Sequence, residues 1–243
     1  MALYTIGDLH LSLAKNKPMD IFGARWQDHT EKIRRRFSAL ITDNDTVVLP
    51  GDFSWAMTLE EAREDFLFLD SLPGKKILSK GNHDYWWTSL TKIKQYLGKI
   101  GVTSIDFLHN NAFFVENCIV CGSRGWFTDQ KFQPNDFNSD YTKLVNRECE
   151  RLKFSLDEGE KLKDGKSVPT VVFLHFPPIY NSFICEPIIK ILSDYNVCHV
   201  YYGHIHGDYS LPQTQKYGDL IMSLISADYL NFTPQKVFLN EFT

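Results

Sequence analysis

The sequence lacks the long apolar run that a membrane-spanning helix requires. No hydrophobic stretch reaches about 18 residues. The first residues, MALYTIGDLHL, contain no basic segment followed by an apolar core, which a secretory signal would need. We therefore expect neither a membrane partner nor a signal peptide, and we predict a cytoplasmic location.

Cysteine is scarce in this chain of 243 residues. The cysteines are Cys118, Cys121, Cys149, Cys185 and Cys198. An odd, scattered set is unlike the disulfide framework of a small secreted domain. Cys118 and Cys121 form a C-x-x-C, but NCIVCG has a strand pattern in which positions three apart face opposite sides. No second pair completes a zinc site, so we predict reduced, mostly buried thiols.

An excess of positive charge is also missing, because the formal net charge is −4. The single basic run, 34–36, lies in a helical pattern that fans its side chains around the axis. No broad basic surface is available for a nucleic-acid backbone, so we expect no duplex nucleic acid as a partner. Nothing in the sequence indicates an oligomeric state.

Repeats, low-complexity tracts and linkers are absent as well, so we predict one domain over residues 1–243. Strand patterns occur at ALYTIG, TVVLPG, KKILSKG, SIDFL, AFFVE, CIVCG, TVVFLHF, CHVYYGH and LIMSLIS. Helical patterns span 28–41, a segment beginning at 58, 88–97 and a long segment from about 140. We expect capping boxes at Asp28/Glu31 and Thr58/Glu61. The alternation predicts an α/β sandwich with helices outside two sheets.

Polar side chains follow five of the strand patterns. They are Asp8 and His10 in GDLH, Asp52 in PGDFSW, Asn82, His83 and Asp84 in GNHD, His175 in FLHFPP, and His204 and His206 in GHIHG. In open α/β sheets, ligands bind beyond the carboxyl ends of the strands. One such residue would be an ordinary turn or a structural histidine. Five groups in this register predict converging polar side chains that a shared cation would satisfy, and their number suits two ions.

The spacing within these groups predicts which way the side chains point. Asp8/His10 and His204/His206 are each two residues apart, so in extended backbone each pair projects to one side. Asn82 and His83 are direct neighbours and project to different sides. We therefore expect Asn82 to face a metal ion while His83 faces the substrate.

The order GD-x-H, GD, GNHD, H and GH-x-H resembles that of the calcineurin-like metallophosphoesterase superfamily. The blocks KPMDIFG, GDFSWAM, NHDYWW, SRGW and YGHIHG are similar to a bacterial branch of predicted phosphohydrolases. The resemblance implies a four-layer α/β/β/α sandwich of two mixed sheets flanked by helices. It also implies a dinuclear metal-dependent phosphohydrolase that cleaves a small or medium phosphate mono- or diester by attack of a metal-bound hydroxide.

The resemblance implies a role for each motif residue. The implied ligands are Asp8, His10 and His206 for the first metal, Asn82, His175 and His204 for the second, and Asp52 as the bridge. His83 would be the catalytic imidazole that assists leaving-group departure, and Asp84 would orient it. Mixed His, Asp and Asn ligands suit Mn, Fe, Zn or Ni, and we favour Mn.

Other side chains near the strand ends have either a functional or a structural role. Arg124 in GSRGW stands between glycines, and we interpret it as a substrate-binding fork for phosphate rather than the partner of a surface Asp. The aromatic residues there are Phe53, Trp55, Tyr85, Trp86, Trp87 and Trp126. We expect them mainly to pack helices onto a sheet, with a pocket lining as the alternative. His109 and His199 match no motif position and are expected to be structural.

Alternative functions follow from the same residues. A nuclease or cyclic-nucleotide phosphodiesterase of the same superfamily is the first alternative, although the acidic balance disfavours a nuclease. A non-catalytic metal-binding scaffold is the second, but a scaffold is expected to lose His83 or several ligands, and none is missing. A protein phosphatase would need a peptide groove, which nothing in the sequence indicates.

Overall fold

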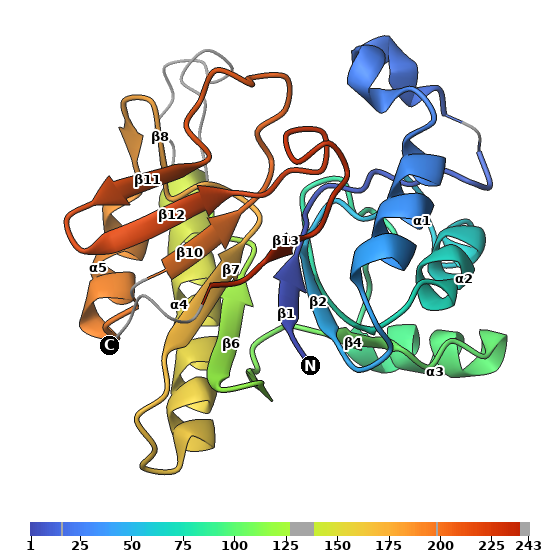
Figure 1. The fold of residues 1–243 in the computed structure, drawn as a ribbon. Coiled ribbons are helices and arrows are strands. Elements are labelled where there is room, and N and C mark those ends of the chain that lie inside the picture. The colour runs from blue at the N-terminus through green and yellow to red at the C-terminus, as the bar shows by residue number, and fades with distance from the viewer. Residues whose placement is uncertain (16, 127–138, 198, 239–243) are drawn as a thin grey trace.

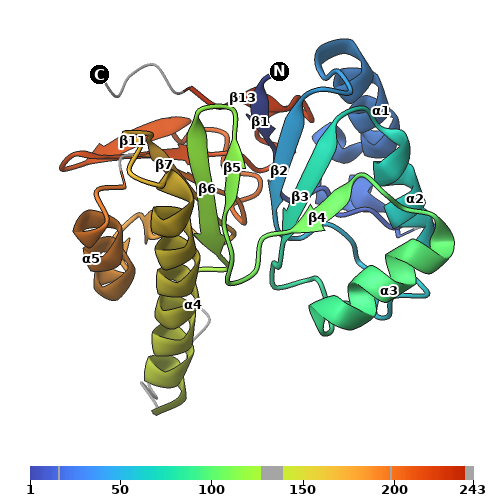
Figure 2. The same cartoon turned by 90° about the horizontal axis from the view of Figure 1, so that it is seen from below.

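The computed structural model describes residues 1–15, 17–126, 139–197 and 199–238. Two sheets lie face to face, and helices cover the outer face of each (Figure 1). Helices α1, α2 and α3 flank the first sheet, whereas α4 and α5 flank the second, as the view from below also shows (Figure 2). The predicted four-layer α/β/β/α sandwich is confirmed.

Both sheets have parallel strands in the middle, and three of their four edge strands are antiparallel. The first has the order β13-β1-β2-β3-β4, comprising β13 Gln235–Lys236, β1 Leu3–Thr5, β2 Thr46–Pro50, β3 Lys75–Ser79 and β4 Ile105–Phe107. The second has the order β11-β12-β10-β7-β6-β5, comprising β11 Thr214–Tyr217, β12 Leu220–Leu224, β10 His199–Tyr202, β7 Thr170–Leu174, β6 Cys118–Ser123 and β5 Phe113–Val115. A hairpin pairs β8 Ile179–Tyr180 with β9 Phe183–Ile184. Strands β13, β11 and β5 are the antiparallel members of the two sheets.

The helices are α1 His29–Leu40, α2 Arg63–Ser71, α3 Leu90–Ile100, α4 Ser139–Lys163 and α5 Glu186–Asp194, with short 3-10 turns η1 Met19–Phe22 and η2 Ala24–Trp26. Sequence reasoning missed α5, the β8–β9 hairpin, β11 and β13. The segments of α5 and of the hairpin are short and carry too few periods to separate helix from strand. Strands β11 and β13 are short and polar, so they have no apolar alternation to mark them. No helix within the described ranges is both long and apolar enough to cross a bilayer.

Three apolar clusters hold the layers together. Ile33 and Phe37 of α1 are fully buried against the first sheet, and Leu152 and Leu156 of α4 pack on the second. Between the sheets lie buried residues of both, among them Val48, Ile77, Val171, Phe173 and Tyr201. Because parallel strands are covered on both faces, their apolar runs are nearly continuous, as TVVLP and TVVFL are.

One predicted helix cap is wrong and the other is displaced. Asp28 precedes α1 in the left-handed conformation, with φ of 50°, and its side chain makes no capping hydrogen bond. At the second site Glu61 N donates to Thr58 Oγ1 at 3.2 Å and Met57 N to Glu61 Oε2 at 2.8 Å. These bonds close a turn before α2, which begins five residues after Thr58.

The cysteine expectations are confirmed for four residues. Cys118, Cys121, Cys149 and Cys185 are free and buried. Cys118 lies in the cluster between the sheets and Cys121 in the cluster beneath α4, on opposite faces of β6. Burial raises the pKa of both thiols to about 12, so they are poor nucleophiles and metal ligands. Cys198 lies outside the described residues.

Candidate metal centre

Two groups of ligand-type side chains meet at the carboxyl ends of the central strands. Asp8, His10 and His206 form the first group, and Asp52, His175 and His204 form the second. In each group the ligand atoms all lie within 4.8 Å of one another. Asn82 joins the second group, because its Oδ1 is 2.6 Å from Nε2 of His175. The structure therefore brings together all seven residues that the motifs predicted as ligands.

Asp52 lies between the two groups. Its Oδ2 is 3.7 Å from Nε2 of His10 and 3.5 Å from Nε2 of His175. Its Oδ1 accepts a hydrogen bond from the backbone N–H of His83 at 2.7 Å. One carboxylate oxygen is thus within reach of both groups, which is the position that a shared ligand would take.

The polar atoms of the site fit a pair of divalent cations. Asp8 Oδ1 is buried without a hydrogen-bond partner, while its Oδ2 accepts from His204 N at 2.9 Å. Nε2 of His10 and Nε2 of His206 face each other at 3.2 Å. A carboxylate oxygen and several imidazole nitrogens that converge away from water need a cation or a proton among them. The mixture of imidazole, carboxylate and amide oxygen is a common donor set for first-row transition metals.

The protonation states of the histidines favour metal binding. Burial lowers the pKa of His204 to about 2, and it lowers the pKa of His10 and His175 well below the usual range. These three imidazoles are therefore neutral at neutral pH, which is the form that binds a metal. Burial and the neighbouring Asp52 carboxylate raise the pKa of Asp8 to about 7, against the opposing effect of His206.

The backbone at the site is not extended, contrary to the sequence-based expectation. Asp8, His10, Asp52 and His204 have φ of 59°, 47°, 50° and 70°, in the left-handed region. Asp8 and His10 do reach one group, as predicted. His204 and His206 separate into different groups, which contradicts the spacing argument but is the division that the family resemblance implied. The turn at His204 interrupts the alternation that an extended strand would have.

Two glycines let the ligand loops approach each other. A Cβ on Gly203 would lie closer than 3.0 Å to Oδ2 of Asp8, and one on Gly81 would lie as close to Oδ1 of Asp52. The first contact joins the loops after β10 and β1, and the second joins those after β3 and β2. The glycines in GNHD and GHIHG therefore allow backbone contact with the carboxylates, beyond any role in turning the chain.

Asp84 does not orient His83, so that prediction is wrong. The fully buried Asp84 carboxylate accepts five hydrogen bonds at 2.8–3.3 Å, from the backbone N–H groups of Gly81, Asp52, Phe53 and Ser54 and from Nε1 of Trp86. It joins the loop that carries Asp52 to the loop that carries Asn82. Asp84 therefore positions the backbone of these two loops. Its side chain points into the protein, because it is the direct neighbour of His83, whose side chain faces outward.

His83 lies beside the metal groups, and no carboxylate among the described residues bonds its ring. Its imidazole packs on Trp55 with a centroid separation of 4.3 Å and stands 5.7 Å from the ring of His10. Nδ1 of His83 is buried and has no hydrogen-bond partner. Burial lowers the pKa of His83, with Asp52 opposing it, so the imidazole is neutral in the metal-free site rather than held as an imidazolium by Asp84.

Sequence reasoning missed Asp228, which follows β12. Its buried carboxylate accepts from Nδ1 of His206 at 2.8 Å, from Gly207 N at 3.0 Å and from the Tyr209 hydroxyl at 3.0 Å. A carboxylate behind a histidine fixes the tautomer and ring orientation of a metal ligand. The only sequence signal was an Asp after the apolar run LIMSLIS, and no partner motif marked it.

Within the described ranges, Arg124 pairs with the buried Glu148 of α4 and not with a surface Asp. Its Nη2 lies 3.3 Å from Oε1 of Glu148, and its backbone oxygen accepts from His175 N at 3.2 Å. A main-chain hydrogen bond therefore joins Arg124 to His175 of the second metal group. Its role as a phosphate ligand stays a prediction.

Some of the aromatic residues near the strand ends pack in the core, and others lie at the metal site or on the surface. Phe53 and Trp86 are buried in the core against Phe66, as packing predicts. Trp55 instead stacks on His10 at 4.8 Å, and Tyr85 is exposed. His199 is buried and bonds Ser223 at 2.9 Å, which agrees with a structural role.

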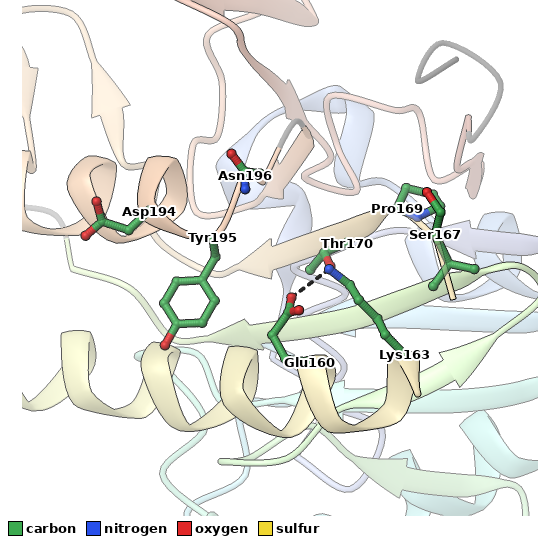
Figure 3. A pocket seen from close by; sticks show the side chains of 9 residues that line it. Glu160, Lys163, Ser167, Pro169, Thr170, Asp194, Tyr195 and Asn196 are labelled. Atoms are coloured by element: carbon green, nitrogen blue, oxygen red, sulfur yellow. Dashed lines mark hydrogen bonds and ion pairs between the residues drawn. The ribbon is translucent and has the colours of Figure 1, made fainter. Parts of the chain in front are cut away.

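A hollow of about 720 Å³ lies at the opposite end of β7 and is not part of this site. Glu160 and Lys163 of α4, which form an ion pair at 2.6 Å, stand over it (Figure 3). Its lining includes Thr170, the first residue of β7, whereas His175 follows the last. No histidine of the described residues lines it, and its size alone therefore does not mark it as functional.

Comparisons with known proteins agree with this geometry. A sequence model of the family described as calcineurin-like phosphoesterase matches residues 1–208. No curated protein matches the chain. Phosphopantetheinyl hydrolase (PptH) from Mycobacterium tuberculosis is 15% identical with a TM-score of 0.55, over 100% of this chain and 97% of that one. The protein TT1561 of Thermus thermophilus is 11% identical with a TM-score of 0.57, over 98% of each chain. At such identities the two likenesses show a shared fold.

Proposed function

The chain belongs to the calcineurin-like phosphoesterase family, and from this premise we propose that it hydrolyses a small or medium phosphate ester at a dinuclear metal centre. Asp8, His10 and His206 would hold one ion, and the group around His175 would hold the other. Mn is favoured among Mn, Fe, Zn and Ni. Two divalent ions, when bound, would supply a water of lowered pKa and charge to stabilise the phosphoryl oxygens.

The chain's own residues would position the ester and manage its protons. Four imidazoles, one amide and two carboxylates would leave two divalent ions with excess positive charge, which suits an anionic phosphate. His83 stands beside the site with its ring fixed against Trp55. The negative charge of a bound phosphate ester would favour the imidazolium form of His83, and that form would donate a proton to the departing alkoxide. Arg124 would contact a phosphate of the substrate through the guanidinium edge that Glu148 does not occupy.

The observation that carries the proposal is the position of Asp52 between the two groups. If Asp52 bridges two ions, Asp52→Ala should lower the occupancy of both and abolish ester hydrolysis. Elemental analysis of metal-loaded protein measures the first effect. Asp106→Asn is the matched control, because Asp106 is an exposed carboxylate on β4. Two full equivalents of metal retained by Asp52→Ala would overturn the bridge.

A substrate panel separates the proposal from its alternatives. Metal-loaded protein should be assayed with nitrophenyl phosphate, its bis-ester, cyclic nucleotides and nucleotide-sugar pyrophosphates. Preference for the bis-ester or the cyclic nucleotides would favour a phosphodiesterase. Turnover of none of these with Mn, Fe, Zn or Ni would favour a non-catalytic scaffold, since the ligand geometry alone can bind metal without reaction.

A further inference from the structure

A second, cation-lined pocket adjoins the metal centre. It has a volume of about 180 Å³ and lies at the carboxyl ends of β3, β4 and β6, beneath α4. Water occupies about 30 Å³ per molecule in the liquid, so the pocket has room for a phosphate-sized group. Three cationic side chains line it, Lys80, Arg124 and Arg151, together with the carboxylate of Glu148.

The two arginines are held in place by Glu148. This residue is fully buried, and its Oε1 lies 2.9 Å from Nη1 of Arg151 and 3.3 Å from Nη2 of Arg124. Nε of Arg124 is buried and has no hydrogen-bond partner among the residues that the structure describes. The buried carboxylate therefore fixes both guanidinium groups while leaving donors of each unused.

Lys80 is the third cation of the pocket wall. Within the described part of the chain, its ammonium group makes no hydrogen bond or ion pair with another residue. Glu148 offsets only one of the three positive charges in the wall. A surface lysine without a partner is ordinary, but Lys80 is half-buried beside two fixed arginines, where like charges repel unless an anion lies among them.

Two loops of the pocket wall lead to the metal centre. Lys80 stands two residues before Asn82, and the backbone oxygen of Arg124 accepts from His175 N and Phe176 N at 3.2 and 2.9 Å. The rings of Trp87 and His109, 5.8 Å apart, form part of the same wall. One extended ligand could therefore place one end at the metals and the other end in the pocket.

We propose that this pocket is a subsite for a second phosphate group of the substrate, contacted by Lys80, Arg124 and Arg151. The substrate class is then an organic phosphate ester that carries another phosphate. This inference rests on the proposed function, because the scissile phosphate is taken to lie at the metal centre. Arg124 serves the second phosphate here, and Glu148 is a positioning residue that touches no ligand.

The test uses binding, so it does not depend on turnover. Mn²⁺-loaded protein is titrated calorimetrically with a series from methylene- to butylenebisphosphonate, and with the monophosphonate of each chain length. At least one bisphosphonate should bind at least about tenfold tighter than its monophosphonate, a factor that one charge-assisted contact can supply. Lys80→Met should abolish this advantage and Lys80→Arg should retain most of it. Lys216→Met is the control, because it removes the same charge from exposed β11.

The outcomes separate the two proposals. An equal affinity for mono- and bisphosphonates overturns the subsite but leaves the metal centre intact. A bisphosphonate advantage that persists in Lys80→Met also overturns the subsite, because the metals alone would then hold both phosphonates. If no phosphonate binds the metal-loaded protein, the proposed function fails and the subsite fails with it.

Discussion

Oδ1 of Asp228 lies 2.8 Å from Nδ1 of His206, and this contact turns Nε2 of His206 toward Asp8 and His10. The carboxylate is itself held by Gly207 N and the Tyr209 hydroxyl. The ring of one proposed metal ligand is thus fixed from behind before any ion binds. Such support reduces the reorganisation that metal binding requires.

Replacing Asp228 should therefore weaken metal binding. An amide in Asp228→Asn accepts a weaker hydrogen bond from Nδ1 of His206, and we expect an affinity loss of about 10–100-fold at one of the two sites. Metal titration of the chelated protein measures it. Asp219→Asn, at an exposed carboxylate near β12, should bind metal like the parent. An unchanged affinity in Asp228→Asn would make the contact structural only.

Metal binding should strengthen as pH rises toward 8. Burial lowers the pKa of His206, but the Asp228 hydrogen bond and the Asp8 carboxylate outweigh burial and raise it to about 8. A proton on His206 competes with the metal below that pKa, and a proton on Asp8 competes below about pH 7. The affinity should therefore rise by at least about tenfold per pH unit up to pH 8 and then level off. Calorimetric titration at several pH values tests this. A flat profile from pH 6 to 8 would mean that His206 is not a ligand.

The rate that is lost when His83 is replaced should depend on the leaving group. General acid catalysis typically contributes about 10²–10⁴-fold and matters most for a poor leaving group. His83→Ala should lose at least about tenfold more rate with alkyl phosphates than with nitrophenyl phosphate, about 1.4 kcal/mol of barrier. Metal content should stay near that of the parent. Equal losses with both esters would assign His83 to stabilising phosphoryl charge, and loss of an ion would make it a ligand.

Replacing Asp84 should loosen the site and lower stability. In Asp84→Asn the amide nitrogen of the new side chain would face N–H donors that now bond a carboxylate oxygen. Leaving one or two buried donors unsatisfied costs about 1–3 kcal/mol each. Denaturant unfolding of the metal-free variant should show this loss, with a lower metal affinity in addition. Full stability with a changed pH–rate profile would instead restore the role of Asp84 in orienting His83.

Much of the fold was predictable from local patterns. The strands TVVLP and TVVFL and the stripe Val145, Cys149, Leu152 and Leu156 of α4 lie where periodicity placed them. Prediction and structure agree here because the position of a residue along a helix or strand decides whether its side chain faces the core, and core-facing side chains are apolar. The strand-end positions of Asp8, Asp52, Asn82 and His175 follow for the same reason, since parallel strands deliver their carboxyl ends to one edge.

The pairing of side chains at that edge was decided by tertiary structure. The family resemblance assigned His204 and His206 to different metals, but the strand spacing placed them on one side, because the left-handed turn at His204 breaks the strand rule. Asp84 bonds backbone N–H groups of a loop that lies far from it in sequence, and Glu148 reaches Arg124 from α4. Local sequence determined which residues are polar at the end of each strand. Which of them touch was determined by loops that meet only after the two sheets have packed together.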